Sequence, residues 1–345
     1  MSQIAICVPT YNRQSALENL CKQILLPIHN RYGRGVDILV RDNSIGLVDY
    51  DFSFVSNLFW FADYGLNPSN LSYHGNVQIL YDLCAEYSYV WFLPDDDDYN
   101  LNVMFGIIDD ILSDLLNADV ILPPFSYTRR PEFISTNDLL KLFSPDLSSK
   151  NPLTGYLTSF DELLIRGTYP FIPLTSSFIF KKRLSLEAIQ IIEKNSTNAW
   201  LHEVLMLSSV DRFSSIQILN CKPYVHYEEI YDTKNQPQIS GMSIEYFHEN
   251  NLKLKELRSL VFNDKNLFDK RTCWRESILW LIQDKDKSIA WSNNRPYSFR
   301  LACRAMLHSV GVFDFWLFTL CACYIFIPSR LIRFIRKLRG SHRAF

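Results

Sequence analysis

The stretch of residues 89–98 (YVWFLPDDDD) does more than any other to limit the folds open to this chain. Five apolar residues are followed by a proline and then by four consecutive aspartates. A short, uniformly apolar run is typical of a strand buried on both faces, and such strands occur in parallel sheets covered by helices. The aspartates would then lie on the loop at the carboxyl end of a central strand, where open α/β sheets bind their ligands.

The four aspartates indicate either a cation site or a plain solvated turn. Two carboxylates 4 Å apart repel each other by about 4 kcal/mol at an effective dielectric near 20. A solvated loop can relax this repulsion, whereas a pocket needs a positive charge to offset it. Because the available ligands are all oxygen atoms, a pocket of this kind would favour a hard divalent ion, Mg²⁺ or Mn²⁺.

The first third of the chain alternates β-type runs with segments of helical periodicity. Apolar runs at residues 4–8 and 36–40 each end in polar residues, and residues 58–62 have the character of a third strand. This alternation predicts an α/β protein with a mostly parallel, doubly wound sheet. No GxGxxG or GxxxxGK[ST] motif is present, which excludes the ordinary dinucleotide-binding and P-loop classes.

Composition limits the partners and the compartment. The net charge is −2, but the charges are unevenly distributed: residues 329–345 contain six Lys or Arg and no acid. Nucleic acid is not an expected partner, because the basic excess is confined to this tail. The eight cysteines form no CxxC pair, which indicates reduced thiols of a cytosolic protein rather than a zinc site or a disulfide framework. The first residues lack the features of a signal peptide and are expected to form the first strand.

Four segments, taken in order, resemble the family 2 glycosyltransferases of the GT-A fold. They are residues 8–13 (VPTYNR), 41–44 (RDNS), 70–76 (NLSYHGN) and the aromatic strand with its aspartates at 89–98. The resemblance covers about the first 125 residues. It implies a GT-A-like sheet that binds a nucleotide diphospho-sugar, with an acidic DxD sequence holding a metal that bridges the diphosphate.

The resemblance also implies roles for individual residues. Thr10 and Tyr11 would line the nucleoside pocket, with Arg13 nearby, and Asp42 would accept a hydrogen bond from the base. A strand-ending turn and an Asx-turn are the alternatives, and for Arg13 the plain turn is the preferred interpretation. The full set of candidates for binding the nucleotide-sugar is Pro9, Thr10, Tyr11, Arg13, Asp42, Asn76, Asp95 and Asp96.

The sequence departs from the family pattern at the metal ligands and at the general base. Since a proline precedes four aspartates, the DxD register is ambiguous: Asp95 with Asp97 is preferred, and Asp96 with Asp98 is the alternative. In the family, a helix that opens with an acidic residue supplies the base. Here the corresponding segment, residues 199–207, reads AWLHEVLML, so Glu203 is the preferred base and His202 the alternative, with a polar helix face as the structural interpretation.

The end of the chain predicts an association with membranes. Residues 310–328 are strongly apolar and precede the basic tail, a pattern that suits an interfacial helix or a marginal span. A buried core helix is the alternative. We therefore expect a GT-A nucleotide-sugar-binding and catalytic domain at residues 1–230, and a helical C-terminal region with a membrane-associating basic tail at 231–345.

Together these features predict an inverting, metal-dependent glycosyltransferase that uses Mn²⁺ or Mg²⁺ and lies on the cytoplasmic face of the cell membrane. Its donor would be a nucleotide diphospho-sugar. Resemblance suggests a lipid-linked saccharide of bacterial surface polysaccharide synthesis, of the O-antigen or capsule type, as acceptor. Two alternatives are a sugar-phosphate nucleotidyltransferase, which would need a glycine-rich loop after the first strand, and a non-catalytic membrane-associated scaffold with a degenerate transferase fold.

Overall fold

The computed structural model describes residues 3–44, 60–95, 97–123, 125–127, 155–165, 178–183, 185–198, 201–220, 224–226 and 244–264, and, nearer the C-terminus, 274, 302–307, 315, 318–319 and 321–322. The chain divides into two compact units, one of residues 1–228 with 261–263 and one of residues 229–260 with 264–345. Most of the long helix α10 (Ile244–Val261) belongs to the second unit. All the strands described below lie in the first unit.

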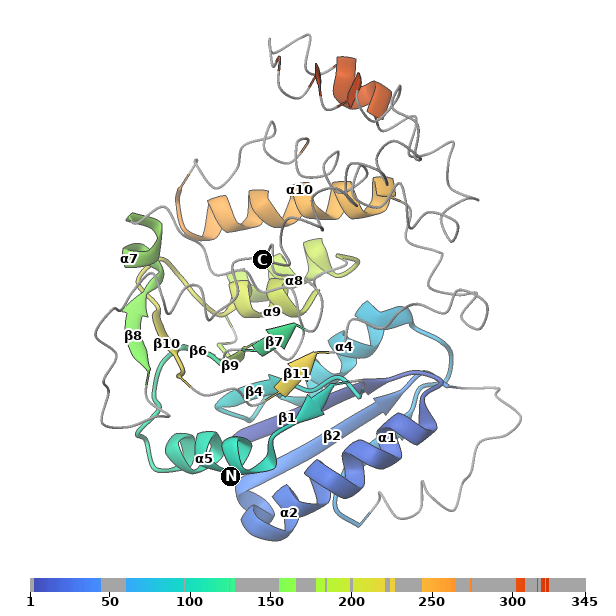
Figure 1. Cartoon of the computed structure of the whole chain (residues 1–345), viewed down its shortest axis with the longest axis vertical. Helices are drawn as coiled ribbons and strands as arrows, with labels where there is room; N and C mark the ends of the chain where they lie inside the picture. The colour runs from blue at the N-terminus through green and yellow to red at the C-terminus, as the bar shows by residue number, and fades with distance from the viewer. Residues whose placement is uncertain are drawn as a thin grey trace, which may run out of the picture. The chain divides into compact units, whose positions relative to one another are not determined.

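An eight-stranded sheet forms the centre of the first unit (Figure 1), with the order β3-β2-β1-β4-β9-β6-β10-β8. The strand pairings make β8 and β9 antiparallel to their neighbours, and the other strands run in one direction. The predicted α/β architecture with a mostly parallel sheet is therefore confirmed. The strands are β1 (Ile4–Thr10), β2 (Val36–Asp42), β3 (Asp63–Leu66), β4 (Tyr89–Phe92), β6 (Val120–Leu122), β8 (Tyr156–Ser159), β9 (Ile179–Lys181) and β10 (Ser215–Ile218).

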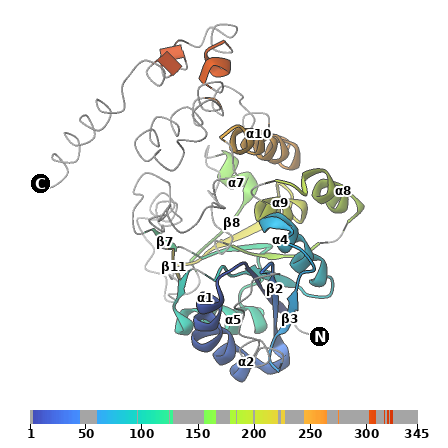
Figure 2. The ribbon, with the colours of Figure 1, turned by 90° about the vertical axis from the view of Figure 1, so that its right-hand side faces the viewer.

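Helices cover both faces of this sheet (Figures 1 and 2). One face carries α1 (Gln14–Leu20), a π-helical turn (Cys21–Leu25), α2 (Leu26–Tyr32) and α5 (Leu101–Leu112). The other carries α4 (Ser72–Leu83) and α9 (Leu201–Ser208), with α8 (Leu186–Asn195) packed against α9. Alternate residues of β1 divide between the two faces: Ile4, Ile6 and Val8 join the core beneath α1 and α5, whereas Cys7 meets Cys84 at the end of α4, Sγ to Sγ 3.3 Å.

A second, smaller sheet holds the far end of the acidic run. It consists of β5 (Asp98–Tyr99), β11 (Tyr224–His226) and β7 (Phe125–Tyr127), with β11 in the middle. Asp98 pairs with Val225 of β11. The acidic loop is therefore anchored at both ends, by β4 of the main sheet before it and by β5 after it.

Two sequence-based assignments were wrong. The third strand was expected at residues 58–62 but lies at Asp63–Leu66, where it pairs with the end of β2. The aromatic residues before it, Trp60 and Phe61, pack instead around His29, with ring centroids 5.4 and 5.9 Å from the imidazole. Residues 124–170 are rich in Pro, Ser and Asn and predict an irregular segment, yet their described part contains β7, β8 and α7 (Phe160–Ile165).

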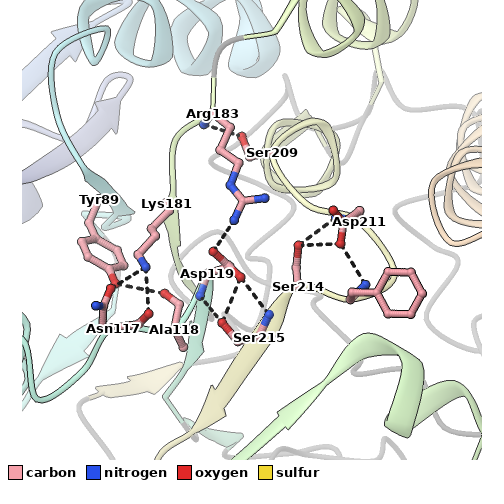
Figure 3. Close-up of polar contacts among 11 residues, drawn as sticks. Tyr89, Asn117, Ala118, Asp119, Lys181, Arg183, Ser209, Asp211, Ser214 and Ser215 are labelled. Atoms are coloured by element: carbon pink, nitrogen blue, oxygen red, sulfur yellow. Dashed lines mark hydrogen bonds and ion pairs between the residues drawn. The ribbon is translucent and has the colours of Figure 1, made fainter.

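A polar network ties three strands together at the amino ends of β6 and β10 (Figure 3). One Asp119 carboxylate oxygen accepts hydrogen bonds from Ser215 N and Oγ at 2.8 and 2.9 Å, and the other accepts from Arg183 Nη2 at 2.5 Å. Burial would raise the pKa of Asp119, but the Ser215 hydrogen bonds and the charges of Arg183 and Lys181 outweigh it and lower the pKa. This network lies at the edge of the sheet opposite the carboxyl ends of β1, β2 and β4.

The predicted membrane anchor falls largely outside the described residues. Among the residues that the structure describes, no helix is long and apolar enough to cross a membrane. Of residues 310–345, only 315, 318–319 and 321–322 are described. The interfacial helix and the basic tail therefore stay predictions.

Candidate active site

Three parallel strands end side by side at one edge of the sheet. Thr10, the last residue of β1, pairs with Asp42, the last residue of β2. On the other side of β1, Leu93 N donates to Cys7 O at 2.8 Å as the chain leaves β4. The carboxyl ends of β1, β2 and β4 thus bring the candidate residues of three distant segments to one place.

Asp95 is held by two residues from the end of β1. Its Oδ2 accepts a hydrogen bond from Thr10 Oγ1 at 2.6 Å, and its Oδ1 lies 3.0 Å from Arg13 Nη1. The Asp95 side chain is 2% exposed and that of Arg13 is 31% exposed. Arg13 therefore supplies part of the positive charge that an acidic loop in a pocket requires, which a plain turn residue would not do.

The remaining aspartates differ in burial. Asp97 is buried and Asp98 is exposed, while Asp96 lies outside the described residues. Asp95, Asp97 and Asp98 line a cavity of about 20 Å³ beside α1, which is room for about one water molecule or ion. Within the described part of the chain, no group of three or more His, Cys, Asp or Glu is placed to hold a metal ion.

Asp95 and Asp97, the preferred metal pair, suit an ion that is coordinated partly by protein and partly by substrate. A Mg²⁺ ion that bridges substrate phosphates takes only one or two protein carboxylates and completes its shell with phosphate oxygens and water. Asp95 and Asp97 offer two carboxylates of this type, and both line the small cavity beside α1. A closed cage made only of protein ligands, as in a structural metal site, is not what these residues form.

Asp42 is fully buried at the end of β2, and Ser44 and Tyr64 donate hydrogen bonds to its carboxylate. Oδ1 accepts from Ser44 N at 2.8 Å and from Ser44 Oγ, and Oδ2 accepts from Tyr64 OH at 3.0 Å. The Ser44 contacts are those of an Asx-turn. A nucleotide base would have to add a hydrogen bond to a side chain that is 0% exposed in this structure.

Three asparagines lock the ends of β1 and β2 to the start of α4. Asn67 Nδ2 donates to Asn43 Oδ1 at 2.7 Å and lies 3.0 Å from Asn76 Oδ1. Asn76 Nδ2 in turn lies 3.2 Å from Thr10 O and 2.9 Å from Arg41 O. Asn76, a candidate ligand-binding residue, is thus buried with its amide bonded to backbone. Sequence reasoning named neither Asn43 nor Asn67 as a candidate, although Asn43 lies in the 41–44 segment; Asn67 follows β3, whose position was not predicted.

Two residues at this edge have strained backbones. Asn12 and Ser72 adopt φ angles of 51° and 62°, which residues with a side chain rarely do. Asn12 N donates to Ser44 Oγ at 2.7 Å, and Ser72 O accepts from Asn43 Nδ2 at 2.9 Å. Strain of this kind persists where the surroundings fix the chain, and it is frequent at functional sites. The neighbouring candidates Pro9 and Tyr11 are half-buried.

Both candidate bases lie in the first turn of α9 and are buried. His202 is 3% exposed and Glu203 is 1% exposed. The His202 ring stacks on Phe178 at a centroid distance of 6.0 Å, and its Nδ1 lies 3.2 Å from Tyr73 OH in α4. Tyr73 is 36% exposed, and it is a residue that sequence reasoning missed although it lies within the 70–76 segment. The Tyr73 contact ties His202 to the first turn of α4, where Ser72 O accepts a hydrogen bond from Asn43 after β2.

No family model matches the sequence, and no curated protein does. Among solved structures, the chain is similar to S. aureus TarS 1-349 in complex with UDP-GlcNAc, at 13% identity and a TM-score of 0.49, over 93% of this chain and 91% of that one. The same TarS fragment in complex with UDP gives a TM-score of 0.48, again at 13% identity and over 93% and 91% of the two chains. At this identity and TM-score, the likeness assigns neither a function nor a site residue to this chain.

Proposed function

We propose that the chain is a glycosyltransferase that moves a sugar from a nucleotide diphospho-sugar to an acceptor hydroxyl. The contact of Asp95 with Thr10 and Arg13 carries this proposal. It joins the acidic loop to the 8–13 segment, which includes the end of β1, at the edge where α/β sheets bind nucleotides. The family resemblance of these same segments supports the choice of reaction.

The donor's diphosphate requires positive charge in this site. Asp95 and Asp97 would hold Mn²⁺ or Mg²⁺, and such an ion, when bound, neutralises the charge that develops on the leaving diphosphate. Thr10 and Arg13 hold the Asp95 carboxylate in one orientation. Arg13 adds a guanidinium, whose planar set of donors suits phosphate oxygens.

An inverting transfer also needs a group that takes the acceptor proton. The two candidate bases are similarly buried, with Glu203 1% and His202 3% exposed, and His202 Nδ1 lies 3.2 Å from the hydroxyl of the partly exposed Tyr73. An imidazole nitrogen that carries no proton can accept one and later release it, which is what a general base does. We therefore assign the role of general base to His202.

The proposed acceptor is a lipid-linked saccharide at the cytoplasmic membrane surface. This proposal is supported by the apolar segment 310–328 and the six basic residues after it. Phe315 and Phe318, in this segment, are 81% and 36% exposed, as expected of residues that enter a headgroup boundary. Deleting residues 310–345 and fractionating cells tests it: a soluble, active truncation supports an anchor, and an aggregated one means that the segment belongs to the core.

Release of nucleoside diphosphate from a panel of nucleotide-sugars tests the main proposal. The panel includes UDP-GlcNAc, the molecule bound in one of the TarS structures. Asp95→Asn is expected to abolish release, whereas Asp109→Asn, which changes a surface carboxylate paired with Arg31, is the matched control and is expected to retain it. Release of pyrophosphate when a nucleoside triphosphate and a sugar 1-phosphate are supplied instead would indicate a nucleotidyltransferase. No turnover of either set of substrates would indicate a non-catalytic protein.

A further inference from the structure

The contact between Tyr73 and His202 joins the first turn of α4 to the first turn of α9. The Tyr73 hydroxyl lies 3.2 Å from His202 Nδ1, and the two rings meet edge to face, with centroids 6.4 Å apart and an angle of 78°. Phe178 also packs against the imidazole, with centroids 6.0 Å apart and an interplanar angle of 29°. The imidazole is thus held in orientation by packing from two neighbouring segments.

Tyr73 is also fixed relative to the ends of β1 and β2. Asn43, the residue after β2, donates from Nδ2 to Ser72 O at 2.9 Å, and its Oδ1 accepts from Leu71 N at 3.4 Å. One turn later in α4, Asn76 Nδ2 reaches Thr10 O at 3.2 Å. The start of α4 is therefore attached to the strand ends on both sides of Tyr73.

Burial separates the two members of the pair. His202 is 3% exposed, whereas Tyr73 is 36% exposed. An acceptor hydroxyl must come within about 3 Å of the group that takes its proton, directly or through one intermediate group. Of the two residues, only Tyr73 is exposed enough to meet an acceptor from solvent.

We propose that Tyr73 contacts the acceptor hydroxyl and that His202 acts through it, an inference that rests on the proposed function. As the acceptor oxygen bonds to the anomeric carbon, the bond from that carbon to the phosphate oxygen breaks, and its electron pair leaves with the nucleoside diphosphate. The acceptor proton passes to the Tyr73 oxygen while the phenolic proton passes to unprotonated His202 Nδ1. The enzyme thus takes up the acceptor proton and ends as an imidazolium, which later returns its proton to solvent through the Tyr73 hydroxyl.

The chemistry of the two side chains suits these roles, contact with the acceptor for Tyr73 and uptake of the proton for His202. A phenol donates and accepts hydrogen bonds at the same oxygen, so it can pass a proton on without holding a charge. With an ordinary pKa of about 10, a tyrosine alone would be mostly protonated at neutral pH and a poor base. The imidazole supplies the basicity, and the phenol supplies the contact with the substrate.

The test compares Tyr73→Phe with the control Tyr87→Phe, which also removes a hydrogen-bonding hydroxyl. The Tyr87 hydroxyl donates to Asp37 Oδ2 at 2.8 Å, near the amino end of β2 and away from the carboxyl ends that form the site. Tyr73→Phe is expected to lower kcat for transfer by about 100-fold, in the range of general acid–base effects, with donor Kd unchanged. Tyr87→Phe is expected to leave kcat unchanged. His202→Gln, which can still bond the Tyr73 hydroxyl but cannot take a proton, is expected to lose kcat as Tyr73→Phe does.

A second readout does not require turnover. In ¹⁵N NMR of the histidine side chains, Tyr73→Phe is expected to shift the Nδ1 signal of His202, and Tyr87→Phe is expected to leave it in place. An unshifted signal overturns the proposal whatever the activity. If Tyr73→Phe or His202→Gln transfers at the wild-type rate while Asp95→Asn is inactive, the proposal is wrong and the glycosyltransferase assignment stands. If the wild type transfers no sugar, the assignment fails and the proton path fails with it.

Discussion

Replacing Arg13 by glutamine isolates the charge that this side chain places beside Asp95. In the structure, Arg13 Nη1 lies 3.0 Å from Asp95 Oδ1, and Thr10 holds the other carboxylate oxygen. A divalent ion that binds Asp95 must compete with this guanidinium for the same carboxylate. We therefore expect the Arg13→Gln variant, with no donor present, to bind Mn²⁺ more tightly than the wild type.

The size of the effect follows from the geometry. Two unit charges 4 Å apart interact by about 4 kcal/mol at an effective dielectric of 20, whereas exposed ion pairs contribute roughly 0–1 kcal/mol after screening. The Asp95 side chain is 2% exposed but that of Arg13 is 31% exposed, so the pair lies between these limits. About 1–2 kcal/mol corresponds to a decrease of roughly 5- to 30-fold in the Kd for Mn²⁺.

Electron paramagnetic resonance of free Mn²⁺ during a titration measures this Kd directly. Arg31→Gln, which removes a surface ion pair to Asp109 at 2.7 Å, is the matched control and is expected to leave the Kd unchanged. Unchanged or weaker Mn²⁺ binding by Arg13→Gln would refute the idea that Arg13 competes with the ion for Asp95. Weaker binding would mean that Arg13 holds the carboxylate in the orientation that the ion needs.

Three further predictions concern the metal, the hydrogen bonds of Asn76, and Asp119 at the opposite edge of the sheet. Donor turnover is expected to stop with a chelator and to return with Mn²⁺ or Mg²⁺, and Asp97→Asn is expected to lower turnover by at least 100-fold without changing the Tm; full activity in chelator would rule out the metal. Asn76→Ala removes side-chain hydrogen bonds to Thr10 O and Arg41 O, so its free energy of unfolding, measured in urea, is expected to fall by about 2 kcal/mol. Asp119→Asn is expected to cost about 1–2 kcal/mol at pH 7, because its hydrogen bonds involve a charged carboxylate. Since the folded-state pKa of Asp119 is lowered, this contribution is present above the unfolded-state pKa and is lost as pH falls through the folded pKa, so urea titrations of wild type and variant should converge in acid. A difference that persists at low pH would assign the cost to packing.

The sequence by itself determined the central strands and the edge at which they end. Residues 4–8 and 89–93 are uniformly apolar, and burial on both faces is the environment that such a run requires. The acidic run could only follow the strand at its carboxyl end. The same local reasoning failed at β3, because an edge strand need not be uniformly buried: the burial of Asp63–Leu66 is mixed, and its pairing with β2 decides where it lies.

Only the tertiary structure decided which side chains of the site meet. Thr10 and Asp95 are 85 residues apart, Arg13 and Asp95 are 82 apart, and Tyr73 and His202 are 129 apart. No local pattern encodes such contacts, because they depend on the order and register of the strands and on how α4 and α9 pack against them. The sequence could name Thr10, Arg13, Asp95 and His202 as polar residues at the ends of elements. That Arg13 neutralises Asp95 and that His202 lies behind Tyr73 follows from burial and distance, which exist only once the strands are assembled.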